Sequence, residues 1–272
     1  MANQYEVLGK APGLEELNKL SSSDVHLTIR KLSAGYGKME ILHDFDLSVS
    51  KAQSLCLIGP NGAGKTTVLD IICGKTKSSK GNIIFNGEDI TNKEEFIISR
   101  KGVGRKFQIP SVFKELTVKE NLYVALNSSL GFFSNIINFF NPADQEKIDK
   151  IAEFVGLKDD LEKQAQFLSH GQTQWLEIAL VVLKEPRLIL MDEPTAGMTD
   201  YETSQTVKLF NKLKETHTLI IVEHDMGFVK EISDIVTVMH EGTLLAEGKT
   251  SIIENDEKVK KAYLGNKGIT NA

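Results

Sequence analysis

One glycine-rich segment of this sequence has the residue types and spacing to hold phosphate groups. It reads Gly59-Pro60-Asn61-Gly62-Ala63-Gly64-Lys65-Thr66. Because glycine lacks a Cβ, such a loop can turn its backbone N–H groups toward phosphate oxygens. Lys65 supplies a positive charge for β- and γ-phosphates, and the Thr66 hydroxyl can join the coordination shell of Mg²⁺. The loop therefore predicts a site for a nucleoside triphosphate.

An acidic pair follows an apolar stretch further along the chain. Leu188–Met191 is followed by Asp192 and Glu193. Carboxylates at the carboxyl end of a buried parallel strand lie where such sheets bind ligands. Asp192 would hold Mg²⁺, and Glu193 would act as a general base on the attacking water. Without the phosphate loop, two solvated acids at a strand end would be the better interpretation.

A histidine occupies the equivalent place after the next apolar stretch. His224 comes shortly after Leu219–Val222. At the same edge of the sheet it could contact a γ-phosphate and sense its loss. A lone histidine is more often structural, so the neighbouring motifs carry this interpretation.

The segment Leu168–Gln172 combines a capping pattern with a second anion site. Ser169, followed three residues later by Gln172, predicts a capping box that opens an apolar helix. A capped helix start that contains glycine can also bind an anion. The chain then has two anion sites, the phosphate loop and this helix start, but a bound nucleotide needs only one of them from the same chain. We therefore expect a head-to-tail pair of subunits, each offering this helix to its partner's γ-phosphate.

The elements that must position these residues predict an α/β fold. Continuous apolar runs predict strands that are covered on both faces, and helical stretches such as Tyr201–Glu215 alternate with them. The runs are Leu55–Ile58, Leu188–Met191, Leu219–Val222 and Ile235–Met239. Alternating polar and apolar residues at 25–32 and 45–49 predict an antiparallel layer at the start. We expect a mostly parallel P-loop (RecA-like) core with an N-terminal antiparallel β subdomain and an inserted α-helical subdomain.

The same patterns give the expected domain boundaries. The chain is predicted to comprise a loosely attached leader that is a candidate for disorder (1–24), an ATPase domain (25–250) and a C-terminal helix and tail (251–272). Within the ATPase domain, residues 25–108 and 184–250 form the α/β core with its β layer, and 109–183 form the helical subdomain.

Composition narrows the class of protein. The chain has 272 residues, of which 41% are hydrophobic and 25% charged, with a net charge of −5. Nucleic-acid binders are more often basic, so we expect no nucleic-acid partner. Cys56 and Cys73 lack metal-ligand spacing and are interpreted as buried thiols in a reducing compartment. Residues 1–24 show no secretory-signal pattern, and the apolar segment Leu130–Phe140 is shorter than the ~20 residues of a membrane span.

Taken in order, these motifs resemble those of the ABC-type ATPases. The resemblance runs from about Val25 to Gly248, and Leu168–Gln172 is similar to the signature of that family. It implies that Tyr36 stacks on adenine and that Gln108 reaches Mg²⁺ and water and relays to a membrane partner. Phe113 follows shortly after Gln108 and has two interpretations: it lines the groove for the membrane partner, or it belongs to the core of the helical subdomain.

The resemblance implies a complete site around ATP and Mg²⁺. The expected catalytic residues are Glu193, His224 and Gln108, and the expected metal ligands are Thr66, Gln108 and Asp192. The expected nucleotide-binding residues are Tyr36, Gly59, Pro60, Asn61, Gly62, Ala63, Gly64, Lys65, Thr66, Thr67, Ser169, Gly171 and Gln172.

Two departures from the family pattern narrow the choice of branch within the family. His170 replaces the usual signature glycine, and Thr199 replaces the usual aspartate of the D-loop, the segment after the acidic pair. Together with Gly104–Gln108 and Ala262–Gly265, they resemble the importer branch for branched-chain amino acids and urea. The chain most resembles the urea-uptake ATPase subunit. The alternative solute is a branched-chain or hydrophobic amino acid, because no residue here would touch the solute.

The resemblance also implies partners and location. We expect a second ABC ATPase subunit in a homo- or heterodimer, two integral-membrane permease subunits, and an extracytoplasmic solute-binding protein acting indirectly. The chain would lie peripherally on the cytoplasmic face of the inner (plasma) membrane. A soluble, non-transport ABC ATPase is a second alternative, although the usual coiled-coil insertion or second cassette is missing. A non-hydrolysing ATP-binding scaffold is disfavoured by Glu193.

Overall fold

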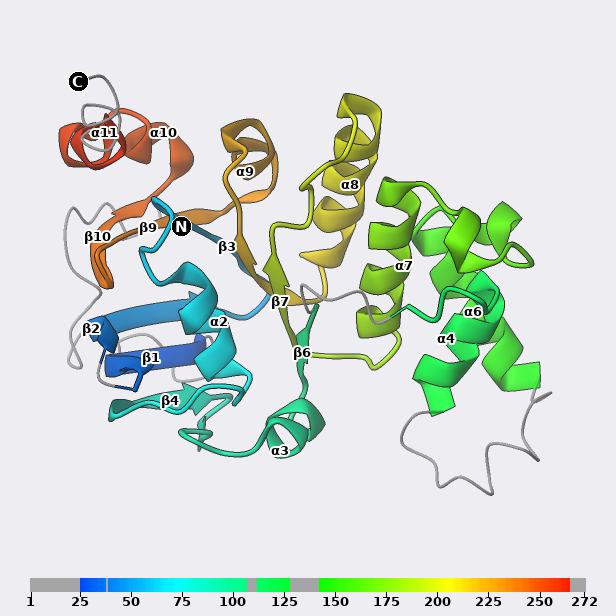
Figure 1. Ribbon diagram of the computed structural model, residues 1–272, viewed down its shortest axis with the longest axis horizontal. Coiled ribbons are helices and arrows are strands. Elements are labelled where there is room, and N and C mark those ends of the chain that lie inside the picture. The colour runs from blue at the N-terminus through cyan, green and yellow to red at the C-terminus, as the bar shows by residue number, and fades with distance from the viewer. Residues whose placement is uncertain (1–24, 38, 107–111, 128–141, 265–272) are drawn as a thin grey trace.

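The computed structural model describes four stretches of the chain: residues 25–37, 39–106, 112–127 and 142–264. Figure 1 shows the arrangement along the longest axis of the molecule. A small antiparallel sheet lies at one end, a group of helices at the other, and a larger sheet runs between them.

The small sheet forms the predicted antiparallel layer. Its strands lie in the order β2-β1-β4-β5 and are β1 (Val25–Tyr36), β2 (Met39–Ser50), β4 (Lys80–Phe85) and β5 (Glu88–Asp89). The alternation in β2 buries Leu42, Phe45, Leu47 and Val49 on one face. Both of the first two strands are longer than predicted, because register shifts let the pairing continue past residues that interrupt the alternation.

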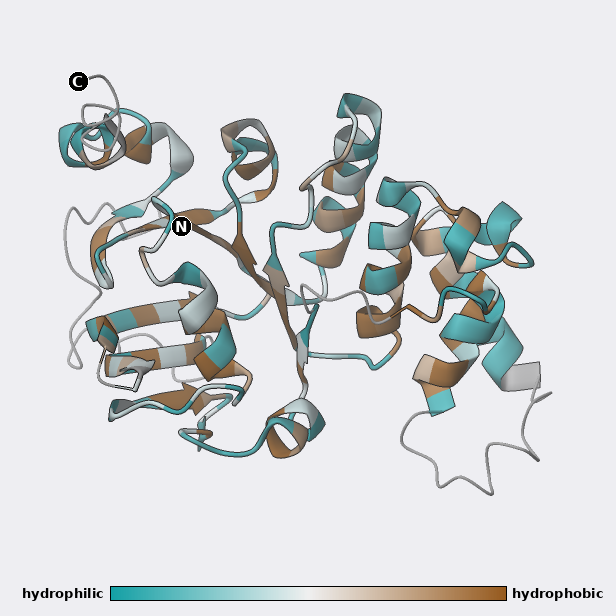
Figure 2. Ribbon diagram, viewed as in Figure 1, coloured by the Kyte–Doolittle hydropathy of each residue, from teal (hydrophilic) through white to brown (hydrophobic). Residues whose placement is uncertain are grey.

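The large sheet carries the site and is parallel except at one edge. Its order is β10-β9-β3-β8-β7-β6, with only the β9–β10 pair antiparallel. The strands are β3 (Ser54–Ile58), β6 (Val103–Arg105), β7 (Leu188–Asp192), β8 (Thr218–Val222), β9 (Ile235–His240) and β10 (Thr243–Gly248). Every residue of β3, β7 and β8 is buried, and Figure 2 shows β3 and β7 as brown ribbons. Continuous apolar runs therefore became central parallel strands, as predicted.

The helices divide between the sheets and the far end of the molecule. Figure 1 places α4, α6 and α7 together at that end, while α2 lies beside the small sheet. The helices are α2 (Lys65–Ile72), α3 (Glu95–Arg100), α4 (Val118–Asn127), α6 (Pro142–Phe154), α7 (His170–Val182), α8 (Asp200–Leu213), α9 (Met226–Ile232), α10 (Thr250–Ile253) and α11 (Glu257–Leu264). Short 3₁₀ turns, η1 (Lys158–Asp160) and η2 (Ala165–Phe167), precede α7.

Two hydrophobic cores lie on opposite faces of the large sheet. One contains Leu55 and Leu57 of β3 with α2 and the small sheet. The other contains Cys56 and Ile58 of the same strand with α7, α8 and the helical group. Because successive side chains of a strand point to opposite faces, β3 anchors both cores and fixes the loop that follows it.

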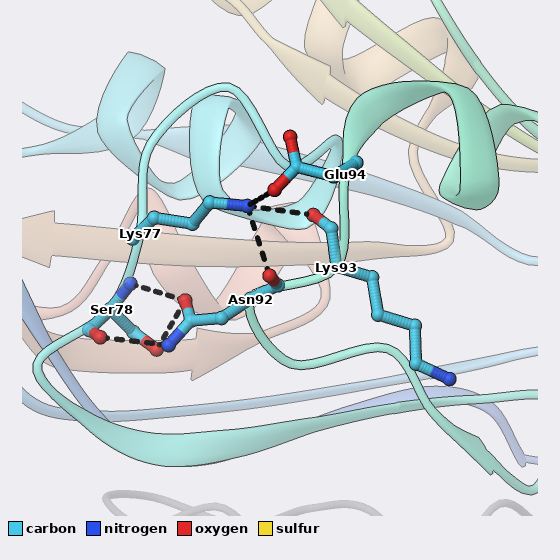
Figure 3. A network of polar contacts seen from close by, with 5 residues as sticks. All are labelled: Lys77, Ser78, Asn92, Lys93 and Glu94. Carbon is cyan, nitrogen blue, oxygen red and sulfur yellow. Dashed lines mark hydrogen bonds and ion pairs between the residues drawn. The ribbon is translucent and has the colours of Figure 1, made fainter.

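A polar network ties the segment after α2 to the turn before α3 (Figure 3). Lys77 Nζ donates to the carbonyl oxygens of Asn92 and Lys93, at 2.9 and 3.2 Å, and to Glu94 Oε1 at 2.8 Å. The Asn92 side chain accepts from Ser78 N at 2.7 Å and donates to Ser78 O at 3.0 Å. This exposed network joins two segments that flank the small sheet.

The structure also tests the predictions made for the two cysteines, for Phe113 and for membrane-spanning segments. Cys56 and Cys73 are both buried and free of disulfides, as predicted, although Cys73 Sγ also accepts a hydrogen bond from Arg105 at 3.1 Å. Phe113 is 53% exposed, which favours the partner groove over the core of the helical subdomain, the two interpretations left open from the sequence. In the four described stretches, no helix has the length and apolar character of a membrane span. Leu130–Phe140 falls outside those stretches.

Candidate functional site

The phosphate loop connects β3 to α2 and depends on its glycines. Gly59, Gly62 and Gly64 have φ values of 151°, 82° and 98°, which L-residues with a Cβ rarely adopt. A Cβ on Gly59 would lie 2.2 Å from Met239 O, and one on Gly64 would lie 2.7 Å from Leu42 Cδ2. The loop is therefore packed tightly against β9 and β2, which hold it at the carboxyl end of β3.

Lys65 is buried at the start of α2 and is held by the loop that precedes it. Its Nζ donates to Gly59 O at 2.7 Å and to Pro60 O at 3.0 Å. Burial lowers the pKa of Lys65, and nearby Glu193 and Asp192 oppose that shift. The ammonium group therefore lies close to both acidic residues predicted for the site.

Asp192 ends β7 as a buried carboxylate, 6% exposed. Burial raises its pKa, while a hydrogen bond from Thr66 and the charge of Arg105 act in the opposite direction. The contact with Thr66 brings together the two described residues that were predicted to hold Mg²⁺. A hydroxyl and a carboxylate are hard oxygen ligands of the kind Mg²⁺ prefers.

Glu193 is the next residue, and its backbone is strained. Its φ is +48°, in the left-handed region that non-glycine residues seldom adopt. Its N–H donates to Val222 O of β8 at 2.9 Å, and its Oε1 lies 3.0 Å from His224 Nε2. Strain of this kind persists where the surroundings impose it and tends to mark functional sites. Both side chains are partly exposed, 44% and 40%, so they face the surface at the edge of the sheet.

The sequence interpretation missed Glu223, the buried neighbour of His224. Its carboxylate is 3% exposed and accepts from Thr195 N at 3.0 Å, Thr195 Oγ1, His224 N at 2.8 Å and Asp225 N at 3.4 Å. It thereby joins the loop after β7 to the loop after β8. The only sequence signal was an acid directly after an apolar strand, and the pairing that makes it important is not local.

Two consecutive basic residues at the end of β6 connect the site to two different helices. Arg105 forms a buried ion pair with Asp70 of α2. Lys106 Nζ lies 3.3 Å from Glu177 Oε2 of α7, also in a buried pair. Burial lowers the pKa of Lys106 and raises that of Glu177, and each residue opposes the shift of the other. The segment that leads to Gln108 is therefore anchored on both sides.

The signature segment forms the predicted capping box at the start of α7. Ser169 Oγ accepts from Gln172 N at 3.1 Å, and Gln172 Oε1 accepts from Ser169 N at 3.0 Å. His170 reaches the loop after β7, where its Nε2 lies 2.9 Å from Ala196 O. A Cβ on Gly197 would meet the His170 ring at 3.2 Å. The first departure from the family pattern thus packs on the D-loop of its own chain.

The second departure forms a capping box of its own at the start of α8. Thr199 Oγ1 accepts from Glu202 N at 3.3 Å, and Glu202 Oε2 accepts from Thr199 N at 3.0 Å. Threonine therefore retains a helix-capping role at the place of the usual D-loop aspartate.

The predicted residues fall into two groups that are apart in one chain. The first comprises Thr66, Lys65, Asp192, Glu193 and His224, linked by the contacts described above. Thr67 is buried in the first turn of α2. The second group, at the start of α7, contacts the start of α8 instead. Figure 1 shows α2 and α7 separated along the long axis, with strands of the large sheet between them.

Two predicted residues are beyond what the structure describes. Tyr36 ends β1, but its side chain lies outside the described part of the chain. Gln108 lies in 107–111, also outside it.

Comparisons with known proteins agree with this geometry. Residues 42–196 match the ABC transporter family. The chain is 36% identical over 244 residues to a probable branched-chain amino acid transport ATP-binding protein, LivG, of Archaeoglobus fulgidus, covering 88% of this chain and 95% of that protein. It is also 36% identical over 248 residues to the high-affinity branched-chain amino acid transport ATP-binding protein LivG of Escherichia coli (strain K12), covering 88% and 97%.

A solved structure has the same fold. The ATP-binding cassette of an ABC transporter in its ADP conformation superposes with a TM-score of 0.78 at 31% identity, covering 89% of this chain and 99% of that one. The family match spans more than half of the chain and contains both the phosphate loop and the acidic pair. The chain therefore belongs to the ABC transporter family, as an ATP-binding subunit that hydrolyses ATP to drive transport.

Proposed function

We propose that ATP binds on the loop Gly59–Thr66 and is hydrolysed beside Glu193 and His224. The observation that carries this proposal is that the charged side chains of Lys65, Asp192 and Glu193 lie close together at the carboxyl edge of the large sheet. In this arrangement the loop and Lys65 bind the phosphates, and the adenine would stack on Tyr36.

The side chains divide the chemistry between them. Glu193 accepts a proton from the attacking water, because its carboxylate is partly exposed at the sheet edge. His224, 3.0 Å from that carboxylate, orients it and contacts the γ-phosphate. The buried Glu223 holds the backbone of both loops, so the pair keeps its geometry during turnover.

The residues present suit one Mg²⁺ ion. Thr66 and the buried Asp192 already share a hydrogen bond and would hold it, and Gln108 is proposed as a further ligand. When bound, the ion neutralises charge on the β- and γ-phosphates.

We further propose that two subunits share each site. Ser169, Gly171 and Gln172 would complete the γ-phosphate site of a partner subunit. The separation of α2 from α7 within one chain supports this arrangement, because the signature of the same chain lies away from its own phosphate loop. The partner is a second ABC ATPase, identical or related.

This ATPase serves an ABC importer, and we propose branched-chain or other hydrophobic amino acids as the solute. The similarity to the two LivG proteins over 88% of the chain supports that choice. Urea is the second candidate, favoured by the combination of His170 and Thr199, which distinguishes this chain's signature and D-loop.

The proposed assembly places the chain at the cytoplasmic face of the plasma membrane. It would bind two permease subunits there, and a solute-binding protein would act from the other side. The exposed Phe113 and Phe96 are candidates for the contact with a permease.

Solute uptake in a strain that lacks this chain tests the choice. Loss of radiolabelled leucine uptake, restored by the wild-type gene and not by Glu193→Gln, supports the first solute. Loss of urea uptake with leucine uptake intact supports the second. If neither changes, the proposed importer branch is wrong.

A further inference from the structure

One carboxylate joins the start of α8 to the signature segment. Glu202 Oε2 accepts from Thr199 N and Thr199 Oγ1, both at 3.0 Å, within its own helix start. Its Oε1 accepts from Ser169 Oγ at 2.8 Å. A further hydrogen bond comes from the backbone of Gly171. The donors of the signature segment are therefore directed at a side chain of the same subunit.

The contact uses the single donor that the Ser169 side chain has. A serine hydroxyl carries one proton and two acceptor lone pairs. The oxygen of Ser169 accepts from Gln172 N to cap α7, and its proton is donated to Glu202. Ser169 can donate to another acceptor only after the bond to Glu202 is released.

The glycine of the signature has a matching constraint. A Cβ on Gly171 would lie 2.4 Å from the Glu202 carboxyl group. Real Cβ atoms do not approach other atoms this closely, so the carboxyl group lies directly against the Gly171 backbone. Glu202 thus contacts both Ser169 and Gly171, the signature residues proposed to bind the γ-phosphate of a partner subunit.

We propose that the Glu202 carboxylate competes with the γ-phosphate bound by the partner subunit for the hydrogen-bond donors of Ser169 and Gly171. In the separated subunit its carboxylate occupies the donors of Ser169 and Gly171, and it must leave them when two subunits close on ATP. Its hold on those donors sets the ATP concentration at which closure occurs. The inference rests on the proposed sharing of sites between subunits.

Charge and capping both fit this exchange. The bonds from Thr199 and Ser169 lower the pKa of Glu202, so the group is an anion at neutral pH. A carboxylate and a phosphate repel each other and cannot share one proton donor. After release from Ser169, Glu202 can keep its bonds to Thr199, so α8 remains capped.

The test uses the full-length chain carrying Glu193→Gln, which is expected to form a stable ATP-bound dimer. Glu202→Gln is added, because the capping box accepts either residue at this position and α8 should remain intact. Light scattering during titration with ATP and Mg²⁺ gives the half-dimerising ATP concentration. A neutral amide holds the Ser169 proton less strongly than a carboxylate, so we expect that concentration to fall about fivefold.

Asp200→Asn is the matched control. It removes one negative charge from the same helical turn, and among the described residues Asp200 forms no hydrogen bond or ion pair with the signature segment. We expect it to change the half-dimerising concentration by about twofold or less, as for an exposed charge. An equal fall in both variants would assign the effect to charge alone and overturn the proposal.

The same titration separates failure of the role of Glu202 from failure of the shared site. If the Glu193→Gln chain dimerises and Glu202→Gln does not lower the half-point, the role of Glu202 is wrong and the shared site stands. If no variant dimerises with ATP, the shared site itself is wrong, and the role of Glu202 is rejected with it.

Discussion

Glu193 and His224 lie 3.0 Å apart, between Oε1 and Nε2, although one follows β7 and the other follows β8. The two strands are parallel neighbours, and Asp192 pairs with Val222 at their carboxyl ends. This register places the segments that follow the two strands side by side, so that Glu193 lies near His224, the second residue after β8. The acid and the histidine therefore form one polar group, which the following predictions test.

Replacing the proposed base should separate binding from hydrolysis. In Glu193→Gln, we expect kcat to fall about 10²- to 10⁴-fold, the range for loss of a general base. ATP binding should remain, because Lys65 and the loop are unchanged. Phosphate release measures the first effect and calorimetric titration with ATP the second.

Glu185→Gln is its control, since Glu185 is another glutamate with positive φ, 50°, on an exposed turn. It should retain full activity. A Glu193→Gln protein that hydrolyses ATP at the wild-type rate would show that the base lies elsewhere.

Removing the lysine of the loop should weaken ATP binding. Lys65→Ala deletes a buried ammonium group beside the phosphate site. Hydrogen bonds to charged groups contribute about 1.5–3 kcal/mol, so we expect affinity to fall at least about tenfold. Calorimetric titration with ATP and Mg²⁺ is the measurement.

The exposed Lys258→Ala on α11 serves as the comparison and should bind ATP as the wild type does. Unchanged affinity in Lys65→Ala would rule out the assignment of the loop, provided that circular dichroism shows both proteins folded.

Glu223 should act as a positioning residue whose loss affects both stability and turnover. Glu223→Gln replaces one of two acceptor oxygens by a donor facing backbone N–H groups, which leaves buried groups unsatisfied. The expected cost is about 1–3 kcal/mol, or roughly 2–12 °C in Tm. We also expect kcat to fall more than KM rises, because the two catalytic loops lose their shared anchor.

Glu231→Gln is matched to it, because Glu231 is an exposed glutamate in the pocket that Glu193, Glu223 and His224 also line. It should change neither Tm nor kcat. Intact kcat in a folded Glu223→Gln protein would limit Glu223 to a structural role.

His26 should make stability depend on pH. It is 4% exposed, its Nδ1 lies 2.6 Å from Thr218 Oγ1, and burial, followed by Lys51 and Arg187, lowers its pKa from 6.5 to about 4. Because the folded state disfavours the proton, its contribution is full above pH 6.5 and is lost as the pH falls toward 4. The loss should reach up to about 3 kcal/mol.

Urea unfolding at pH 7.5, 6, 5 and 4 measures this dependence. His26→Gln should have a flatter profile over that window, whereas His43→Gln, at an exposed position, should keep the wild-type slope. Parallel profiles for all three proteins would contradict the assignment to His26.

Sequence patterns predicted the long elements better than the short ones. The apolar runs at 55–58, 188–191 and 219–222 lie in β3, β7 and β8. β6 (Val103–Arg105) and β5 (Glu88–Asp89) were not predicted, because three or two residues are too few to show a period. Such strands exist because a neighbouring strand already offers hydrogen-bonding groups.

The site divides in the same way. The capping boxes Ser169–Gln172 and Thr199–Glu202 are local, since each depends on a spacing of three residues within one helix start. The phosphate loop is local as well, because its conformation follows from the glycines between one strand and one helix.

What the sequence alone determined about this protein is therefore the set of local motifs and their chemistry. Tertiary structure decided how they combine: His224 beside Glu193, Glu223 between two loops, and Glu202 on Ser169, which is 33 residues away in the chain. These contacts follow from strand order and helix packing, which sum over many distant residues, and no spacing in the chain encodes them.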